Sequence, residues 1–425
     1  MRRRLRFFTV CLGVLFVSSL IFAGPLVPSA QAAEKPIKIG FSMALSGGLA
    51  AAGKAALLSM QICAEDFNKK GGVLGRPVEL VYYDDHSKPA DVPAIYTKLI
   101  TVDKVDFVVG PYATAMIAPA MPIVMQHKMA FITLYGLAVN PKFNYPYYFQ
   151  IMPAGPQPYT DWSTGFFEIA SEQTPKPKTV ALLGEDHEYG VNGQIGAEQN
   201  AKRFGMKVVY KKRFPPGTPD CTPLMRAIKA HNPDLVWMST YPPGTVCTLR
   251  AAKEVGLVPK MIGGGLVGAQ YTSIQTSFGP DMNNVVFYHT WAPAPTLKFR
   301  GIDAFLKKYQ AQAAKEGLDP LGYYLPPYAY AYLEIQLQAI EASKSMDQKT
   351  VGEYMRNNEF DTVVGKVRFD PKNGEWEKSR MLQVQVQGVK GHEVSEFAKP
   401  ETFVVFYPKK WAYGKLVYPF PGWKK

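Results

Sequence analysis

The sequence has few of the side chains on which catalysis and metal binding depend. Its 425 residues include 4 cysteines and 6 histidines, and the cysteines lack the paired spacing of a zinc site. The motifs GxSxG and HExxH and the phosphate-binding P-loop are absent. Asp186-His187-Glu188 is a single run, and since adjacent loop residues do not converge on one ion, we expect a solvated loop there. The sequence therefore favours a protein that is not an enzyme and that holds no metal or cofactor.

Long apolar runs are also missing beyond the first residues, so no later segment is expected to span a bilayer. The chain begins with the basic stretch Met1–Arg6 and the apolar stretch Phe7–Ala23, and Ala30-Gln31-Ala32 has the small-x-small form of a cleavage site. An apolar stretch of about 17 residues is short for a membrane anchor. We therefore predict that residues 1–32 are a signal peptide cleaved near Ala32 and that the mature protein is periplasmic. Arg3-Arg4 leaves the export route, Sec or twin-arginine, open.

No basic run accounts for the net charge of +13. The excess positive charge is spread along the chain, and the predicted signal peptide contributes to it without adding any acid. A dispersed charge is typical of a soluble basic surface, whereas nucleic-acid binding needs a basic patch or stripe. We therefore expect no nucleic-acid partner.

Three cysteines follow the predicted signal peptide. Cys63 shares one face of an expected helix with Leu57 and Met60, which indicates a buried apolar position. Cys221 and Cys247 flank an expected strand over 235–238, and an oxidising compartment allows them to pair. We predict a disulfide between these two, and the pattern leaves two separate thiols as the alternative.

Apolar strands alternate with helical segments, beginning with a strand over 37–41, a helix over 54–68 and a strand over 78–83. Such a βαβ unit has its ligand-binding crevice at the carboxyl ends of the strands, here close to Ser46. The alternation pauses at the Pro-rich segment 152–158 and then resumes. The further expected strands lie over 107–109, 130–133, 179–183, 207–210, 235–238, 260–262, 366–370, 381–386 and 403–407, and the further helices over 117–127, 191–204, 223–231, 245–255, 301–315 and 323–340. This alternation predicts an α/β fold of two doubly wound units with a binding crevice between them.

Gly263–Gly268 matches the dinucleotide-binding fingerprint GxGxxG. The match comes late in the chain, and the acid that follows it, Asp281, is closer than the roughly 20 residues typical of that fingerprint. We interpret the segment instead as a loop in which glycines allow unusual backbone angles and a close approach to a ligand.

Short motifs along nearly all of the remaining chain add a more specific indication. They are Lys38-Ile39-Gly40, Leu45-Ser46-Gly47, Asn68-Lys69-Lys70-Gly71-Gly72, Tyr83-Asp84-Asp85, Val109-Gly110-Pro111, Asp186-His187-Glu188-Tyr189-Gly190, Asn232-Pro233-Asp234 and Ala252-Lys253-Glu254-Val255-Gly256-Leu257. In this order they resemble the branched-chain amino acid (Leu/Ile/Val) binding family, the type I periplasmic solute-binding proteins of ABC importers.

The resemblance implies two Rossmann-like lobes joined by a hinge of three crossovers. Lobe one would hold residues 33–152 and 292–380, and lobe two would hold 153–291 and 381–425. A ligand in contact with both lobes would shift the population towards the closed form. The implied function is that a monomer captures a small-molecule ligand and delivers it to an inner-membrane ABC permease.

The same resemblance implies the ligand-binding residues. Relatives place an acid that pairs the ligand ammonium where this chain has Gly265, and a buried ammonium without a partner costs several kcal/mol. Thr114 matches a hydroxyl that binds the ligand carboxylate, whereas Leu137 replaces a second hydroxyl. The implied ligand-binding residues are Ser46, Ala52, Tyr112, Ala113, Thr114, Tyr135, Gly136, Leu137, Tyr189, Tyr241, Gly265 and Tyr324.

The implied pocket also differs from that of the relatives in shape. Ala50-Ala51-Ala52 stands where relatives often carry a bulky aromatic side chain, and several tyrosines match other cleft positions. A wider, aromatic-lined pocket with one anion-binding end predicts an aromatic or long apolar carboxylate as the ligand. The alternatives are urea or a short amide, a branched-chain amino acid, or a ligand-sensing module that serves a membrane receptor.

Overall fold

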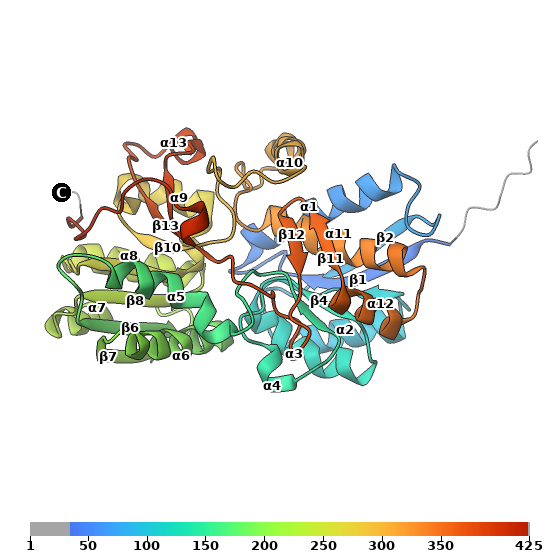
Figure 1. Cartoon of the computed structure of the whole chain (residues 1–425), viewed down its shortest axis with the longest axis horizontal. Coiled ribbons are helices and arrows are strands. Elements are labelled where there is room, and N and C mark those ends of the chain that lie inside the picture. The colour runs from blue at the N-terminus through green and yellow to red at the C-terminus, as the bar shows by residue number, and fades with distance from the viewer. Residues whose placement is uncertain (1–34, 424–425) are drawn as a thin grey trace, which may run out of the picture. The chain divides into compact units, whose positions relative to one another are not determined.

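The computed structural model describes residues 35–423, and the predicted signal peptide lies outside the described residues. Strands and helices alternate through this part of the chain, and the strands form one large sheet and several smaller ones (Figure 1). Pairing within the central strands is parallel, with antiparallel strands at one edge of the large sheet. The predicted α/β class is therefore confirmed.

The smaller sheets, together with the helices beside them, are called lobe one here. β1 pairs in parallel with β2 on one side and β3 on the other, and β4 pairs in parallel with β5. A bridge between Tyr112 and Leu134 links the chain just after β3 to the chain just after β4. The elements are β1 Ile37–Met43, α1 Ala50–Asn68, β2 Val78–Asp84, α2 Val92–Thr101, β3 Phe107–Val108, α3 Thr114–Gln126, β4 Phe131–Thr133, α4 Asn140–Phe143, β5 Tyr148–Gln150, α10 Ile302–Glu316, α11 Pro326–Ser343, α12 Gln348–Asn357, β11 Glu359–Thr362 and β12 Gly365–Arg368.

The large sheet and its helices are called lobe two here. Its seven strands follow the order β14-β13-β10-β9-β8-β6-β7. The elements are α5 Pro158–Ser171, β6 Thr179–Glu185, α6 Glu188–Arg203, β7 Lys207–Phe214, α7 Thr222–Ala230, β8 Leu235–Thr240, α8 Pro242–Glu254, β9 Met261–Leu266, η1 Val267–Gln270, α9 Thr272–Phe278, η2 Gly279–Met282, β10 Val286–His289, β13 Leu382–Val386, α13 Val394–Ala398, β14 Phe403–Tyr407 and η3 Lys409–Trp411.

α1 packs on α11, and the two helices lie next to each other in Figure 1. Ala55 and Ala56 of α1 are buried, and the Tyr332 hydroxyl of α11 lies 3.0 Å from Met60 Sδ. Cys63 is a buried free thiol on the same helix, as predicted. The packing fixes the start of α1, which borders the cleft described below.

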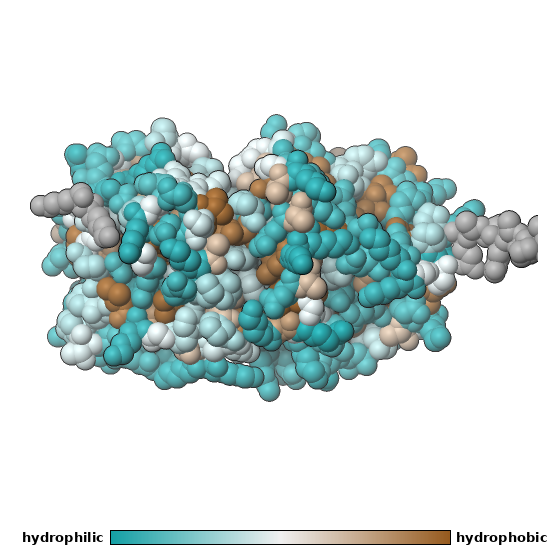
Figure 2. All heavy atoms as spheres, turned by 90° about the horizontal axis from the view of Figure 1, so that it is seen from above, coloured by the Kyte–Doolittle hydropathy of each residue, from teal (hydrophilic) through white to brown (hydrophobic). Residues whose placement is uncertain are grey.

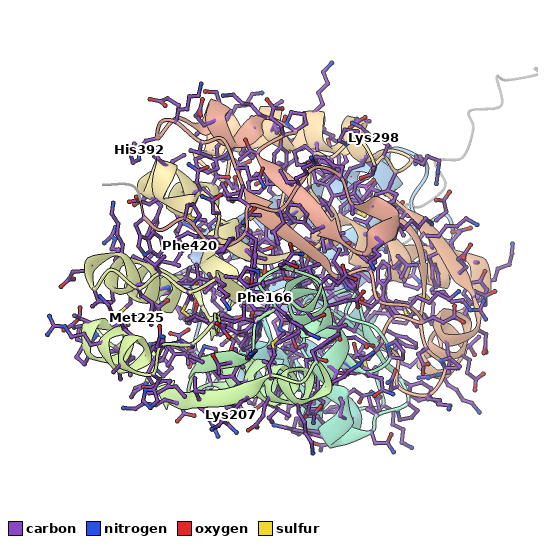
Figure 3. All side chains as sticks on the ribbon, turned by 60° about the vertical axis from the view of Figure 1, so that its left-hand side comes forward. Phe166, Lys207, Met225, Lys298, His392 and Phe420 are labelled. Carbon is purple, nitrogen blue, oxygen red and sulfur yellow. A yellow bond between two sulfur atoms is a disulfide. The ribbon has the colours of Figure 1, made fainter. Side chains whose placement is uncertain are left out.

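Aromatic side chains fill the interior of lobe two. Phe166 and Phe167 of α5 are fully buried, and Figure 3 shows Phe166 within the packed layer of side chains. Trp162, one turn earlier, packs against Tyr288 of β10 with ring centroids 4.0 Å apart and the ring planes tilted by 57°. The helix therefore anchors a tyrosine that faces the cleft.

Three connections carry the chain between the two lobes. They lie between β5 and β6, between β10 and α10, and between β12 and β13. The boundaries predicted near residues 152, 291 and 380 lie in these connections. We propose them as the limits of the lobes.

Several predicted helix starts are wrong by three or four residues. α1, α3 and α6 begin earlier than predicted, at Ala50, Thr114 and Glu188, whereas α11 begins later, at Pro326. Leu49, Ala113 and His187 occupy the N-cap positions of the first three helices, so no Ser, Thr, Asp or Asn marks their starts. Among the elements that the sequence did not predict are α2, α5, β5, β10 and α12.

The structure joins Cys221 and Cys247 in a disulfide with Cα atoms 5.6 Å apart. Cys221 is the N-cap residue of α7, and Cys247 lies in α8. These two helices pack on each other beside β8, so the bond ties neighbouring elements.

Polar residues predominate on the face drawn in Figure 2, with apolar residues scattered among them. Within residues 35–423, the large apolar side chains that are exposed are far apart in the sequence: Val102, Ile195, Val258, Val394 and Val417. No helix within residues 35–423 is both long and apolar enough to cross a membrane.

Candidate ligand-binding site

Side chains from both lobes surround a small central cavity. Its free space is about 10 Å³, roughly what one water molecule needs. The ten lining residues are Tyr112, Ala113, Thr114, Tyr135, Met152, Tyr189, Tyr241, Val267, Tyr288 and Tyr324. Because aromatic rings fill most of the space, entry of a ligand requires the lobes to part or these rings to move.

The cavity lies where parallel strands end. Tyr112 comes shortly after β3, Tyr135 shortly after β4, and Tyr241 and Val267 directly after β8 and β9. The carboxyl ends of parallel strands are the usual ligand-binding edge of an α/β sheet. Each lobe therefore contributes this edge to the cavity.

Two lining residues hold backbone conformations that L-residues rarely adopt. Ala113 has φ of 84° and Tyr135 has φ of 67°. Strain of this kind costs about 1 to 3 kcal/mol per residue and gathers at functional sites. Both residues belong to loops of lobe one that face lobe two, which supports a functional role for these loops.

Thr114 opens α3 and ties two loops of lobe one together. Its hydroxyl accepts a hydrogen bond of 2.9 Å from the Leu137 N–H and donates a long one of 3.4 Å to the Tyr135 carbonyl. The hydroxyl proton is thus weakly engaged. It can turn to an oxygen atom placed in the cavity.

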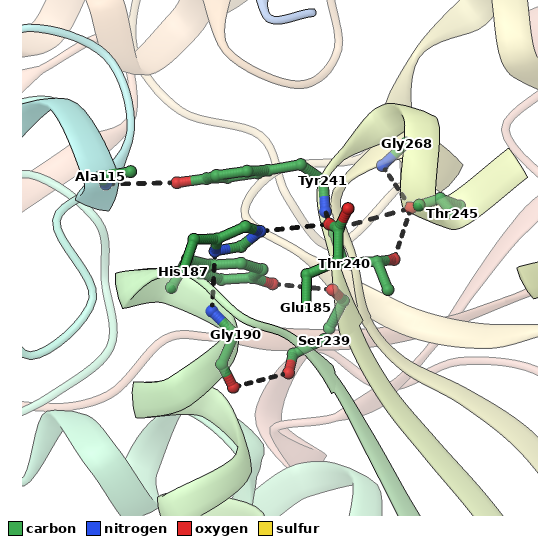
Figure 4. A network of polar contacts seen from close by, with 12 residues as sticks. Ala115, Glu185, His187, Gly190, Ser239, Thr240, Tyr241, Thr245 and Gly268 are labelled. Carbon is green, nitrogen blue, oxygen red and sulfur yellow. Dashed lines mark hydrogen bonds and ion pairs between the residues drawn. The ribbon is translucent and has the colours of Figure 1, made fainter. Parts of the chain in front are cut away.

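Tyr241 reaches across the cavity from lobe two to α3. The Ala115 N–H donates to the Tyr241 hydroxyl at 3.3 Å, as Figure 4 shows. The first N–H groups of a helix lack partners within the helix and favour oxygen atoms and negative charge. The start of α3 therefore binds an oxygen atom in this structure, the phenol oxygen of Tyr241.

A polar network fixes the Tyr241 ring. Its backbone N–H donates to the buried Glu185 carboxylate, and the His187 ring stacks on it with centroids 4.1 Å apart (Figure 4). His187 Nε2 lies 3.1 Å from Glu185 Oε2, and Gly190 N–H donates to His187 Nδ1 at 3.1 Å. The prediction of a solvated Asp186-His187-Glu188 loop therefore holds for Asp186, which is exposed, and is wrong for the other two residues. His187 is largely buried against Tyr241 and Glu185, and Glu188 begins α6.

Gly265 makes room for Tyr189. The Tyr189 hydroxyl donates to the Gly265 carbonyl at 2.8 Å, and a Cβ at Gly265 would lie only 2.8 Å from that hydroxyl. A side chain at this position would therefore push the Tyr189 ring into the cavity.

Tyrosine hydroxyls form a chain beside the cavity. The Tyr112 hydroxyl lies 3.3 Å from those of Tyr271 and Tyr324, and the Tyr324 hydroxyl lies 3.0 Å from that of Tyr288. Burial raises the pKa of Tyr112, Tyr189 and Tyr324 well above that of a free tyrosine. These hydroxyls therefore stay protonated and can donate hydrogen bonds.

Five of the predicted ligand-binding residues do not line the central cavity. The Ser46 hydroxyl donates to Asp84 at 2.7 Å, and Gly136 and Leu137 pack behind Thr114, with the Gly136 carbonyl accepting from Gln150. Gly265 contacts Tyr189, which does line the cavity. Ala52 lines a second pocket, described below. The ligand-binding role of each predicted residue stays a prediction.

The sequence reasoning missed Met152, Val267 and Tyr288. Tyr288 lies in β10, whose apolar run Val285–His289 could have been recognised as a short buried strand. Met152 belongs to the Pro-rich connection, and Val267 begins η1. Val267 lies in the Gly263–Gly268 segment, which was predicted to approach a ligand through its glycines, whereas Met152 has no sequence signal that would place it at a cavity.

The glycine run also differs from its prediction as a loop. β9 extends through Leu266, and Gly263 and Gly264 lie inside it with φ of 147° and 105°. A Cβ at Gly263 would lie 1.6 Å from the Val286 carbonyl oxygen, and one at Gly264 would lie 2.5 Å from the Trp237 ring. The close approach is thus to neighbouring protein groups and not to a ligand.

Asp85, next to the carboxylate that holds Ser46, gives lobe one a dependence on pH. Burial raises the pKa of Asp85 to about 6, although the Ser42 hydroxyl and the Ser87 N–H bond to it. Folding therefore takes up a proton between about pH 4 and pH 6, and the free energy of unfolding falls as pH rises through this window. Asparagine does not titrate in this window. We therefore expect that, between about pH 4 and pH 6, the free energy of unfolding measured by urea titration falls by about 2 kcal/mol less in Asp85→Asn than in the wild type. Equal pH dependence in both proteins would contradict this reading.

The comparisons with known proteins agree with the geometry. Residues 36–392 match the family model described as periplasmic binding protein. The chain belongs to this family. Within it, the chain is a type I member of the branched-chain amino acid binding group. This periplasmic binding protein is thus the substrate-binding component of an ABC transporter, a class of proteins that are not enzymes, and its family implies the periplasm.

Named relatives differ in what they bind. The leucine-, isoleucine-, valine-, threonine- and alanine-binding protein of Pseudomonas aeruginosa is 29% identical over 342 residues, which cover 80% of this chain and 87% of the relative. A substrate-binding protein of Streptococcus pneumoniae, solved with isoleucine, has a TM-score of 0.72 at 20% identity and covers 88% of this chain and 100% of its own. A solute-binding protein of Rhodopseudomonas palustris, solved with p-hydroxybenzoic acid, has a TM-score of 0.72 at 21% identity. The match covers 84% of this chain and 94% of that protein.

Within residues 35–423, no cluster of three or more His, Cys, Asp or Glu side chains is arranged to hold a metal ion.

Proposed function

We propose that this periplasmic binding protein captures a small aromatic or apolar carboxylic acid between its lobes and delivers it to an inner-membrane ABC permease. The observation that carries the proposal is the uncharged lining of the central cavity. It offers hydroxyl and N–H donors at the start of α3 and no carboxylate.

An α-amino acid suits this lining poorly. Its ammonium group would be buried among tyrosine rings, with hydroxyl and carbonyl groups but no acid to balance its charge. Burial of a charge without a partner costs several kcal/mol, which corresponds to a loss of affinity of about a thousandfold. The space that an acid at position 265 would need is taken by Tyr189.

A carboxylic acid without an amino group suits the cavity lining better than an α-amino acid does. One carboxylate oxygen can replace the Tyr241 hydroxyl at the Ala115 N–H, and the Thr114 hydroxyl can turn to meet the same group. Helix N-termini bind anions without a cationic side chain. The tyrosine rings then offer edges and faces to an aromatic or aliphatic body.

The known ligands of the relatives do not decide between an amino acid and a carboxylic acid without an amino group. The Pseudomonas aeruginosa relative is named for branched-chain and small amino acids, and the Rhodopseudomonas palustris neighbour was solved with p-hydroxybenzoic acid. The proposed ligand class therefore rests on the residues of this cleft.

Capture would follow from lobe closure. Contacts between the lobes around the cavity include the Tyr112–Tyr271 contact of 3.3 Å and the bond of 2.9 Å from Asn192 Nδ2 to the Leu137 carbonyl. A ligand held by both lobes would bind the closed form more tightly than the open form. This difference in affinity would raise the population of the closed form.

A thermal-shift panel of carboxylic acids, amides and amino acids tests the proposal. We expect benzoate, 4-hydroxybenzoate and phenylacetate to raise the Tm, because binding to the folded state stabilises it. Urea, leucine, isoleucine and valine should leave the Tm unchanged. A rise with leucine and none with any acid would contradict the proposed ligand class.

A further inference from the structure

A second pocket opens between the lobes next to the central cavity. Its volume is about 380 Å³, within the range of small-molecule sites. Ala51 and Ala52 at the start of α1 line it from lobe one, and Tyr271 and Thr272 line it from lobe two. The pocket therefore exists only where the two lobes face each other.

Tyr324 separates this pocket from the central cavity, because it lines both. Its hydroxyl lies within hydrogen-bond distance of the Tyr112 and Tyr288 hydroxyls, and its ring lies 6.0 Å from that of Tyr271. A change of the Tyr324 rotamer would thus join the two spaces into one channel.

The second pocket has an apolar wall and several polar lining residues. Ala51, Ala52 and Val394 give the apolar wall, and the alanines have no atoms beyond Cβ to fill it. Lys54 and Glu316 are exposed where they line the pocket, and Asp319 is the charged lining residue that is not exposed. Its Oδ1 accepts hydrogen bonds from the Thr272 hydroxyl at 2.6 Å and the Leu321 N–H at 3.1 Å.

The Asp319 carboxylate can accept a further hydrogen bond. Gly322 N–H also lies 3.4 Å from Oδ1, so all of its hydrogen bonds from residues 35–423 go to one oxygen. Oδ2 is free to accept from a group in the pocket. A carboxylate oxygen accepts hydrogen bonds from hydroxyl and amide donors, and more strongly from a protonated amine.

We propose that the second pocket is a subsite for the far end of the ligand, whose carboxylate lies in the central cavity. The ligand class is then an elongated acid with an aromatic or apolar tail that ends in a hydrogen-bond donor. This inference rests on the proposed function, and it adds the length and the distal chemistry of the ligand.

The first test is a ligand series measured by calorimetry on the mature protein. We expect affinity to rise by about tenfold or more from phenylacetate to 6-phenylhexanoate, because the longer tail buries its ring against the apolar wall. Flat or falling affinity along the series, with phenylacetate bound, would overturn the subsite and leave the proposed function standing. Absence of binding by every acid would overturn both.

Variants separate the subsite from a general preference for apolar ligands. Ala51 is exposed on α1, so Ala51→Trp should fold and fill the pocket. It should remove the gain with tail length and leave phenylacetate affinity within about twofold. Ala230→Trp, on the exposed end of α7, is the matched control and should keep the gain. Equal losses for phenylacetate and 6-phenylhexanoate in Ala51→Trp would overturn the proposal.

Asp319→Asn tests the distal donor. Because Oδ1 must remain an acceptor for three hydrogen bonds, the amide nitrogen takes the place of Oδ2. The wild type should prefer 6-(4-hydroxyphenyl)hexanoate to its 4-methoxy analogue by about fivefold, and the variant should lose this preference. An unchanged preference in Asp319→Asn would contradict the assignment of Asp319.

Discussion

Replacement of Gly265 by aspartate is expected to lower the affinity for aromatic carboxylates by about a hundredfold or more. A Cβ at this position would lie 2.8 Å from the Tyr189 hydroxyl and 3.3 Å from the Met238 carbonyl oxygen. The side chain must therefore displace Tyr189 into the cavity, and its carboxylate would repel the ligand. Calorimetry with 4-hydroxybenzoate measures the effect, with thermal unfolding as the check of folding.

A double-mutant cycle provides the control for this prediction. Gly265→Ala introduces only the Cβ, whereas Tyr189→Phe removes the oxygen atom that the Cβ would meet. If the contact is the cause, the two substitutions together should lose less affinity than the sum of their separate losses. Strictly additive losses, or full affinity in Gly265→Asp, would show that Gly265 does not shape the cavity through Tyr189.

Thr114→Val should weaken binding of the same acid by about 1.5 to 3 kcal/mol, because a hydrogen bond to a charged group is lost inside a closed cleft. Calorimetry on the variant and the wild type measures this difference. Part of the loss reflects the Leu137 N–H, which donates to the Thr114 hydroxyl and would lose its acceptor.

Thr114→Ser separates the hydroxyl from the shape of the side chain. Serine keeps an acceptor for the Leu137 N–H and a donor for the ligand, so its affinity should stay within about threefold of the wild type. If the valine variant binds its acid as tightly as the wild type, the start of α3 does not hold the carboxylate.

The sequence predicted the fold well because its information is local and periodic. Apolar runs such as 179–183 and 235–238 became neighbouring parallel strands of lobe two. Helix starts were harder, since Leu49 and Ala113 carry no capping side chain. β10 has a short apolar run that could have been recognised, but its pairing with β13, almost a hundred residues later in the chain, is not visible in the local sequence.

The site was predictable only in part, for a physical reason. Residues after strand ends, such as Tyr112 and Tyr241, could be placed by topology. Val267 and Met152 reach the cavity because two lobes meet, which depends on tertiary packing and not on local spacing. The glycines of β9 illustrate the same limit, because only the structure shows that Gly263 faces the Val286 carbonyl rather than a ligand.

The uncharged tyrosine cavity also explains why a relative's name is a poor guide to the ligand. The fold depends on strands and crossovers that the family shares, whereas we expect ligand choice to depend on a few side chains at strand ends. Here an interlobe tyrosine, Tyr241, meets the start of α3, and Tyr189 occupies the space beside Gly265. Both features support our proposal that the site binds an oxygen anion rather than an ammonium ion.

The most direct test of this account is calorimetry of the mature wild-type protein with 4-hydroxybenzoate and with leucine under the same conditions. The account predicts micromolar or tighter binding of the acid and binding of leucine that is weaker by about a thousandfold, beyond detection. Tight binding of leucine together with weak or absent binding of 4-hydroxybenzoate would contradict it.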